Sequence, residues 1–160
     1  MLKKICTVFF LVLVIPVMAK QTTPEKEAVL KTVNIALDAA AKNKPGKLES
    51  VFAPNAIILD DSPPFVWSGK GSTLRWLSYI HEMANAYDFK AKPPRIVEVT
   101  KNRAYVTLPI AFKGVINQHG KKFSIKDKGC WILVLQKNAK NWQIIGAGWA
   151  SSFQKMLPIK

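Results

Sequence analysis

The sequence predicts an α+β fold, a curved antiparallel sheet that wraps around helices and leaves a cone open at one end. After an apolar N-terminal segment, apolar residues recur at helical spacing, as in Val29, Val33, Ala36 and Ala40. Beyond Lys92-Pro93-Pro94, residues alternate between apolar and polar as in strands. Helices segregated from a run of sequential strands are typical of the α+β class.

The helical half begins at Thr23-Pro24-Glu25, where Thr is a capping residue, Pro suits the first turn and Glu suits the positive end of the helix dipole. We expect this helix to stop at 43–46 and a short helix to follow at about 47–52. Two short strands are predicted at 56–59 and 65–68. Ser72 or Thr73 then caps a helix expected to run to about residue 87.

The strand half is predicted to be a meander. The expected strands cover residues 96–100, 103–116, 121–137 and 142–151. Gly129 lies inside the third of these strands, where we expect a bulge that resets the alternation. Residues 153–160 show no clear element and are expected to form a C-terminal tail.

The N-terminus has the pattern of a cleaved secretory signal. Lys3 and Lys4 precede an apolar run, and Val17-Met18-Ala19 fits a small-residue cleavage site. The run is shorter than the roughly 20 residues that span a bilayer. We therefore predict a signal peptide at 1–19, one domain at 20–152, and an exported protein that is periplasmic or secreted.

The chain is strongly basic, with 24 Lys and Arg residues against 10 acidic residues and a formal net charge of +14. Such a charge favours anionic partners, among them an anionic surface of the cell envelope. Nucleic acid is not expected, because aromatic residues do not interleave the densest lysine set, residues 121–128, as they do in single-strand binders.

The stretch 52–76 is the expected functional region. Asp60 and Asp61 end a short strand, and two prolines and a helix start follow. In a cone mouth lined by aromatic rings, Asp60 would suit a general base; the alternative is a turn aspartate that binds backbone amides. Asp61 is interpreted as a turn acid.

Five tryptophans in so short a chain indicate an aromatic-walled ligand pocket rather than core packing alone. The residues expected to contact a ligand are Trp67, Trp76, Tyr79, Asp127, Trp131 and Trp149. Gly146 and Gly148, which lack side chains, are expected to enlarge the pocket. No metal or other cofactor is predicted, since His81 and His119 lie far apart without neighbouring ligands at metal spacing.

Three motifs carry a family resemblance over about residues 25–152. They are Phe52-Ala53-Pro54-Asn55-Ala56, the glycine Gly69 before the long helix, and Trp142-Gln143-Ile144-Ile145 followed by Trp149-Ala150-Ser151. The order of elements and these motifs resemble the nuclear-transport-factor-2-like superfamily, closest to its SnoaL-like and ketosteroid-isomerase-like branches.

The resemblance implies a cone that binds small molecules, with Asp60 at the position of the isomerases' general base. Ala36 stands where those enzymes keep an oxyanion-hole tyrosine, and Gly129 or Cys130 where they keep a second acid. We therefore expect a binder of a small apolar or aromatic molecule without strong catalytic activity. The alternatives are an assembly module of an envelope complex and an isomerase- or cyclase-like enzyme.

A homodimer is expected as well. The two long strands carry apolar residues on both parities, for example Ile132 and Val134 beside Trp131 and Leu133. An exposed apolar sheet face of this kind usually has a partner.

Overall fold

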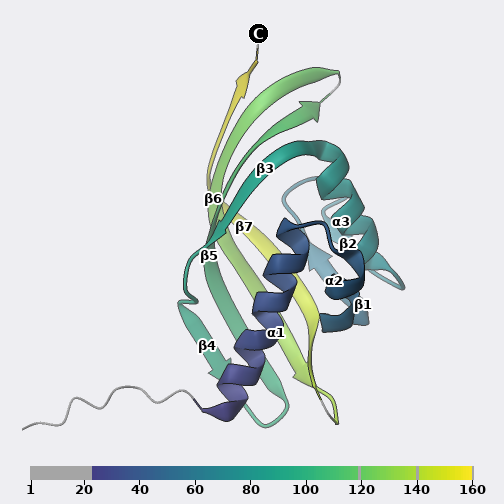
Figure 1. Ribbon diagram of the computed structural model, residues 1–160, viewed down its shortest axis with the longest axis vertical. Helices are drawn as coiled ribbons and strands as arrows, with labels where there is room; N and C mark the ends of the chain where they lie inside the picture. Colours follow the sequence, from purple (N-terminus) through teal and green to yellow (C-terminus); the bar gives the residue numbers. More distant parts are fainter. Residues whose placement is uncertain (1–22, 119, 140, 160) are drawn as a thin grey trace, which may run out of the picture.

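The computed structural model describes residues 23–118, 120–139 and 141–159. Three helices lie on one side of a strongly curved sheet, and the long strands continue past them (Figure 1). The predicted signal peptide at 1–19 and His119 lie outside the described residues. Within them, no helix is long and apolar enough to cross a membrane.

The helices are α1 (Pro24–Ala41), α2 (Pro45–Val51) and α3 (Ser72–Met83). Thr23 caps α1 as predicted, because its hydroxyl accepts a hydrogen bond from the backbone N–H of Lys26 at 3.3 Å. The cap of α3 is Gly71 rather than Ser72 or Thr73, so that expectation is wrong; the φ of Gly71 is +72°, the left-handed conformation that glycine adopts without strain. These local signals fix where the cone's helical wall begins.

Seven strands form one sheet in the order β2-β1-β7-β6-β5-β3, with β4 paired to β5. Their bounds are β1 (Phe52–Leu59), β2 (Val66–Trp67), β3 (Ala84–Ala91), β4 (Ile96–Val99), β5 (Arg103–Gln118), β6 (Lys121–Lys137) and β7 (Trp142–Pro158). The sheet is mixed rather than purely antiparallel, because β1 pairs with β7 in parallel. The α+β cone is otherwise as expected.

The core lies between α1 and the concave face of the sheet. Alternate residues of β5 point inward, so that Ala104, Val106 and Leu108 are almost completely buried. On β6 the odd-numbered residues do the same, including Leu133 and Leu135. This layer fills the narrow end of the cone. The cavity described below lies at the other end, beside α3.

Two further sequence-based expectations about the ends of elements are wrong. The last helix ends at Met83 rather than near residue 87, and the chain continues as β3, which pairs with β5. Residues 153–158 are not a separate tail, because they extend β7 along β6.

The alternation of β6 is not reset at Gly129. Its odd positions remain inward from Ile125 to Leu135. The register shift beside Gly129 adds its extra residue, Ser152, to β7 instead.

Candidate functional site

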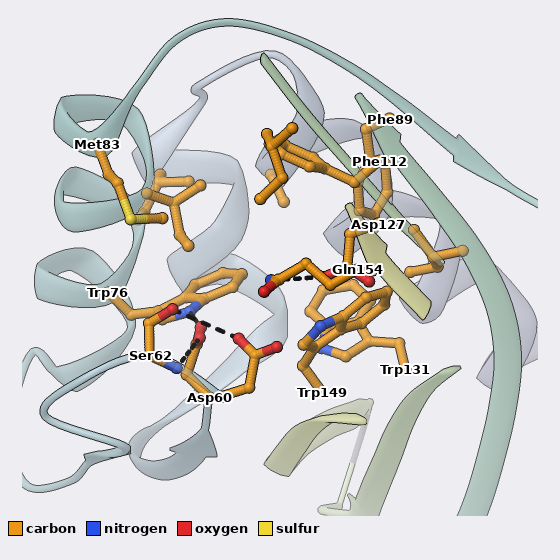
Figure 2. A pocket seen from close by; sticks show the side chains of 16 residues that line it. Asp60, Ser62, Trp76, Met83, Phe89, Phe112, Asp127, Trp131, Trp149 and Gln154 are labelled. Atoms are coloured by element: carbon orange, nitrogen blue, oxygen red, sulfur yellow. Dashed lines mark hydrogen bonds between the residues drawn. The ribbon is translucent and has the colours of Figure 1, made fainter. Parts of the chain in front are cut away.

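A cavity of about 130 Å³ opens between α3 and the concave face of the sheet. Its walls come from α1, α3, four strands and the loop after β1, and Figure 2 shows their side chains converging. Most of the lining is apolar or aromatic. The lining residues are Ala40, Asp60, Asp61, Ser62, Trp76, Leu77, Ile80, Met83, Phe89, Ile110, Phe112, Ile125, Asp127, Trp131, Trp149 and Gln154.

Asp60 follows β1 directly and points toward α3. Its Oδ2 accepts a 2.8 Å hydrogen bond from Nε1 of Trp76, and its Oδ1 accepts a 3.1 Å bond from the backbone N–H of Ser62 (Figure 2). Asp60 is therefore at once the turn residue and the cavity residue that the sequence presented as alternatives. Both oxygens are held, which fixes the carboxylate in orientation.

Asp61 lies at the cavity mouth and is exposed on its other side. Partial burial raises the pKa of its carboxyl, and the neighbouring Asp60 and the more distant Asp127 raise it further. A 3.4 Å hydrogen bond from Oγ of Ser62 acts in the opposite direction. Asp61 was expected only in the turn; it also lines the cavity because of the path of the loop after β1, for which the sequence carries no signal.

Asp127 points inward from the middle of β6 and is 5% exposed. Its Oδ1 accepts a 2.7 Å hydrogen bond from Oγ of Ser151, and its Oδ2 accepts a 3.4 Å bond from Nε2 of Gln154. Both donors belong to the part of β7 that crosses the register shift. Gln154 was not predicted as a site residue, because residues 153–160 were expected to form no helix or strand.

Three tryptophans form the aromatic wall. The rings of Trp76 and Trp131 stack with centroids 6.1 Å apart, and Phe89 meets Trp131 edge-on at 6.4 Å. Trp149 lies opposite Trp131 in the β6–β7 register. Its ring occupies the space over Gly129, where a Cβ atom would come within 2.7 Å of the indole. Gly129 thus leaves room for the Trp149 ring against β6.

Two residues expected at the ligand do not line this cavity. Trp67 lies on the short edge strand β2 and packs against Tyr79 of α3, with ring centroids 5.2 Å apart. Tyr79 lies on α3 where the helix meets β2, and its ring contacts Trp67 rather than the cavity. Burial raises the pKa of Tyr79, and Asp60 and Asp61 add to that increase.

The two glycines of β7 do not enlarge the cavity. An added Cβ at Gly146 would face Val134, and one at Gly148 would face Leu59, 3.9 Å away. Leu59 is exposed on the outer face of the sheet. The register shift between Val134 and Leu135 turns these glycines outward, which the sequence pattern did not indicate.

The site's polar groups are suited to hydrogen bonding and proton transfer. Among the described residues, no group of three or more His, Cys, Asp or Glu side chains is arranged to hold a metal ion. Asp60, Trp76, Asp127, Trp131 and Trp149 come together around the cavity. An apolar chamber with a few converging polar groups is the usual form of a small-molecule site.

No protein-family model matches the sequence, and no curated protein matches it. Solved structures do match the fold. A type 2 hexachlorocyclohexane dehydrochlorinase (LinA) superposes with a TM-score of 0.71 at 13% identity, covering 85% of this chain and 89% of that one.

A ketosteroid isomerase-like protein from Erwinia carotovora atroseptica gives 0.67 at 13% identity, covering 82% and 98%. A nuclear transport factor 2-like protein from Salmonella enterica serovar Typhimurium gives 0.65 at 17% identity, covering 79% and 89%. At these identities the likeness establishes the fold, which is the cone that the resemblance in the sequence implied.

Proposed function

Starting from the nuclear-transport-factor-2-like fold of this chain, we propose that its cone is a binding chamber for a compact, largely apolar molecule about the size of one ring. The observation that carries this proposal is the cavity of about 130 Å³ with an aromatic wall and carboxylates. It is close to the apolar cavity of about 150 Å³ that accepts benzene in another protein. A steroid nucleus of four fused rings exceeds this volume.

The lining supports the same size class. Trp76, Trp131 and Phe89 present ring faces and edges, which suit a flat ring of comparable size. Apolar side chains of α3, Ile80 and Met83, extend the chamber away from Asp60. Removal of the ligand's apolar surface from water then supplies the main part of the binding free energy.

The test is a calorimetric or fluorescence titration with one-ring probes such as toluene, phenol and benzyl alcohol. Ile80→Phe fills the chamber and should abolish binding. Ile132→Phe is the matched control, because Ile132 is 45% exposed on the outer face and should leave binding unchanged. Equal binding by both variants would refute the chamber, as would the failure of every one-ring probe.

Proton-transfer catalysis is the second candidate function. Asp60 and Asp61 are adjacent carboxyls at the cavity, and partial burial raises the pKa of Asp61, as suits a group that exchanges a proton with a ligand. One carboxylate would take a proton from the carbon between the carbonyl and the double bond of a β,γ-unsaturated ketone, and the resulting carboxyl would return the proton to the γ carbon of the dienolate, which moves the double bond into conjugation. Asp60→Asn and Asp61→Asn, assayed separately on enolisable ketones, identify which group acts; turnover by both variants would exclude this function.

We also propose that the chain forms a homodimer through the outer face of the sheet. Exposed apolar side chains lie there in cross-strand register, with Ile57 and Leu59 of β1 flanking Gly146 and Gly148 of β7. Ile132 of β6 continues the row and is 45% exposed. Because the two glycines carry no side chains, a side chain of a second copy could pack between these apolar residues.

Export and contact with an anionic envelope surface complete the proposal. In register across the outer face, Lys113 is opposite Lys126, and Lys126 is opposite Lys155. Like charges directly opposite one another are destabilising, so an anionic partner would reduce the repulsion between these lysines. Cosedimentation with vesicles containing phosphatidylglycerol should be lost in Lys113→Gln/Lys126→Gln. Exported protein should have the mass of a chain beginning at Lys20.

A further inference from the structure

The charge inside the cone is opposite to the charge of the protein. Three of the chain's ten acidic residues, Asp60, Asp61 and Asp127, line the cavity. The chain carries 24 Lys and Arg residues, yet among the described residues that line the cavity none is basic. The ion pairs of the described chain also leave these three acids out.

Among the described residues, the donors that hold Asp60 and Asp127 are neutral. Trp76 and the backbone of Ser62 bind Asp60, and Ser151 and Gln154 bind Asp127. Neutral donors orient a carboxylate but leave its charge uncompensated. A buried carboxylate such as Asp127, which is 5% exposed, is usually paired with a cation.

The walls are aromatic at the same end of the chamber. The stacked rings of Trp76 and Trp131 lie beside Asp60 and Asp127, and Trp149 lies next to Trp131 (Figure 2). Ring faces carry negative potential and attract cations, most strongly in tryptophan. Carboxylates and indole faces around one small space are the arrangement that recognises organic ammonium groups.

We propose that the ligand of this cone is a small organic cation, an ammonium group attached to a compact apolar body. The ammonium lies between Asp61 and Asp127 against the indole faces, and the apolar body extends along α3 toward Ile80 and Met83. This inference rests on the proposed binding function and adds the chemical class of the ligand. The cation supplies the positive charge that no lining side chain of the described chain supplies.

Proton release accompanies binding under this proposal. The groups that face Asp61 are Asp60 on its own loop, Asp127 on β6 and Tyr79 on α3. None of these groups is positively charged. A bound cation would therefore be the opposite charge beside Asp61, and it would favour the ionised form of that carboxyl. Affinity for an ammonium should rise with pH through the titration of Asp61, whereas affinity for a neutral analogue should not.

The experiment compares three ligands of nearly one shape by calorimetry on the mature chain. They are benzylammonium, benzyl alcohol and benzoate. Benzylammonium keeps its charge at neutral pH, as a lysine does. We expect it to bind at least about tenfold more tightly than benzyl alcohol, the factor that one charge-assisted hydrogen bond supplies. Benzoate should not bind measurably.

Charge variants provide the second arm. Asp61→Asn and Asp127→Asn should each lower benzylammonium affinity about tenfold and leave benzyl alcohol affinity within about twofold. Asp88→Asn is the matched control, because it removes the same charge from β3, where Asp88 pairs with exposed Lys90 at 3.3 Å. Asp61 lies at the mouth, so its variant keeps the test valid if Asp127→Asn fails to fold.

The outcomes separate the two proposals. Equal or tighter binding of benzyl alcohol, or an equal loss in Asp88→Asn, would overturn the cation while leaving the binding chamber in place. Failure of all three ligands and of toluene would overturn the chamber itself, and the cation with it. Tighter benzylammonium binding that depends on Asp61 and rises with pH would support both.

Discussion

The indole N–H of Trp76 and the carboxylate of Asp60 are joined by a 2.8 Å hydrogen bond that links α3 to the end of β1. The bond places a strand-end carboxylate against the aromatic wall and fixes both side chains. It also connects two segments that are sixteen residues apart in the chain. The polar end of the cavity depends on this pair.

Trp76→Phe should lower the free energy of unfolding by about 2 kcal/mol, because a partly buried carboxylate loses a charge-assisted hydrogen bond. Urea denaturation followed by circular dichroism measures the change. Trp142→Phe is the matched control: its Nε1 also donates to a carboxylate, Glu25, but that carboxylate is exposed and remains solvated. A smaller loss is expected there, and an equal or larger loss would contradict a special role for the Trp76–Asp60 pair.

Gly129→Ala should destabilise the fold by about 1–3 kcal/mol and displace the Trp149 ring. The new Cβ would come within 2.3 Å of the carbonyl oxygen of Ala150, a backbone atom that cannot move freely. Gly46→Ala in α2 is the control, since nothing lies within 4 Å of an added Cβ there. Thermal melts and Trp fluorescence report the two effects; unchanged values for Gly129→Ala would show that the close approach is absent.

The raised pKa of Asp61 predicts how stability depends on pH. Below the pKa of the unfolded chain the group is protonated in both states and the full stability is present. As pH rises through the higher pKa of the folded state, part of that stability is lost, because the folded state resists ionisation.

Asp61→Asn should therefore be more stable than the parent at neutral pH and equal to it under acidic conditions. Denaturant midpoints at several pH values give the comparison. A difference that grows toward acidic pH would have the wrong sign. Asp88→Asn, which lies away from the cavity and beside Lys90, should not reproduce this profile.

Much of the fold could be predicted from local signals. Thr23 and Pro24 marked the start of α1, and alternation along β5 and β6 identified the buried faces. The missed strand β3 has apolar residues at helical spacing before it, and its pairing with β5 is a long-range contact. Residues 153–158 form a strand only because β6 is long enough to pair with them.

Part of the site could also be predicted, because alternation along the strands indicates which side chains point inward. Asp60, Asp127 and the tryptophans at 76, 131 and 149 were expected and line the cavity. Trp67 was expected in the pocket, but its ring packs on Tyr79 instead, because the edge strand β2 lies beside α3. Gly146 and Gly148 face outward because a register shift in β7, which leaves no mark in the sequence, reverses their orientation.

Ile132→Lys should convert the proposed dimer to a monomer, because it inserts a charge into the apolar row of the outer face. Sedimentation velocity over a range of concentrations measures the change. Leu157→Lys is the control, since Leu157 is also exposed but lies near the far end of β7. A parent chain that sediments as a monomer at about 100 μM, well above the micromolar range of ordinary specific interfaces, would contradict the dimer.

A hollow cone that accepts a one-ring ligand can be detected directly by a methyl NMR titration of isoleucine-labelled protein with benzylammonium and toluene. Ile80, Ile110 and Ile125 line the cavity, whereas Ile57 and Ile132 lie exposed on the outer face and serve as internal controls. We predict saturable shifts confined to the three cavity methyls; shifts confined to the outer methyls, or none at saturating ligand, would contradict the claim.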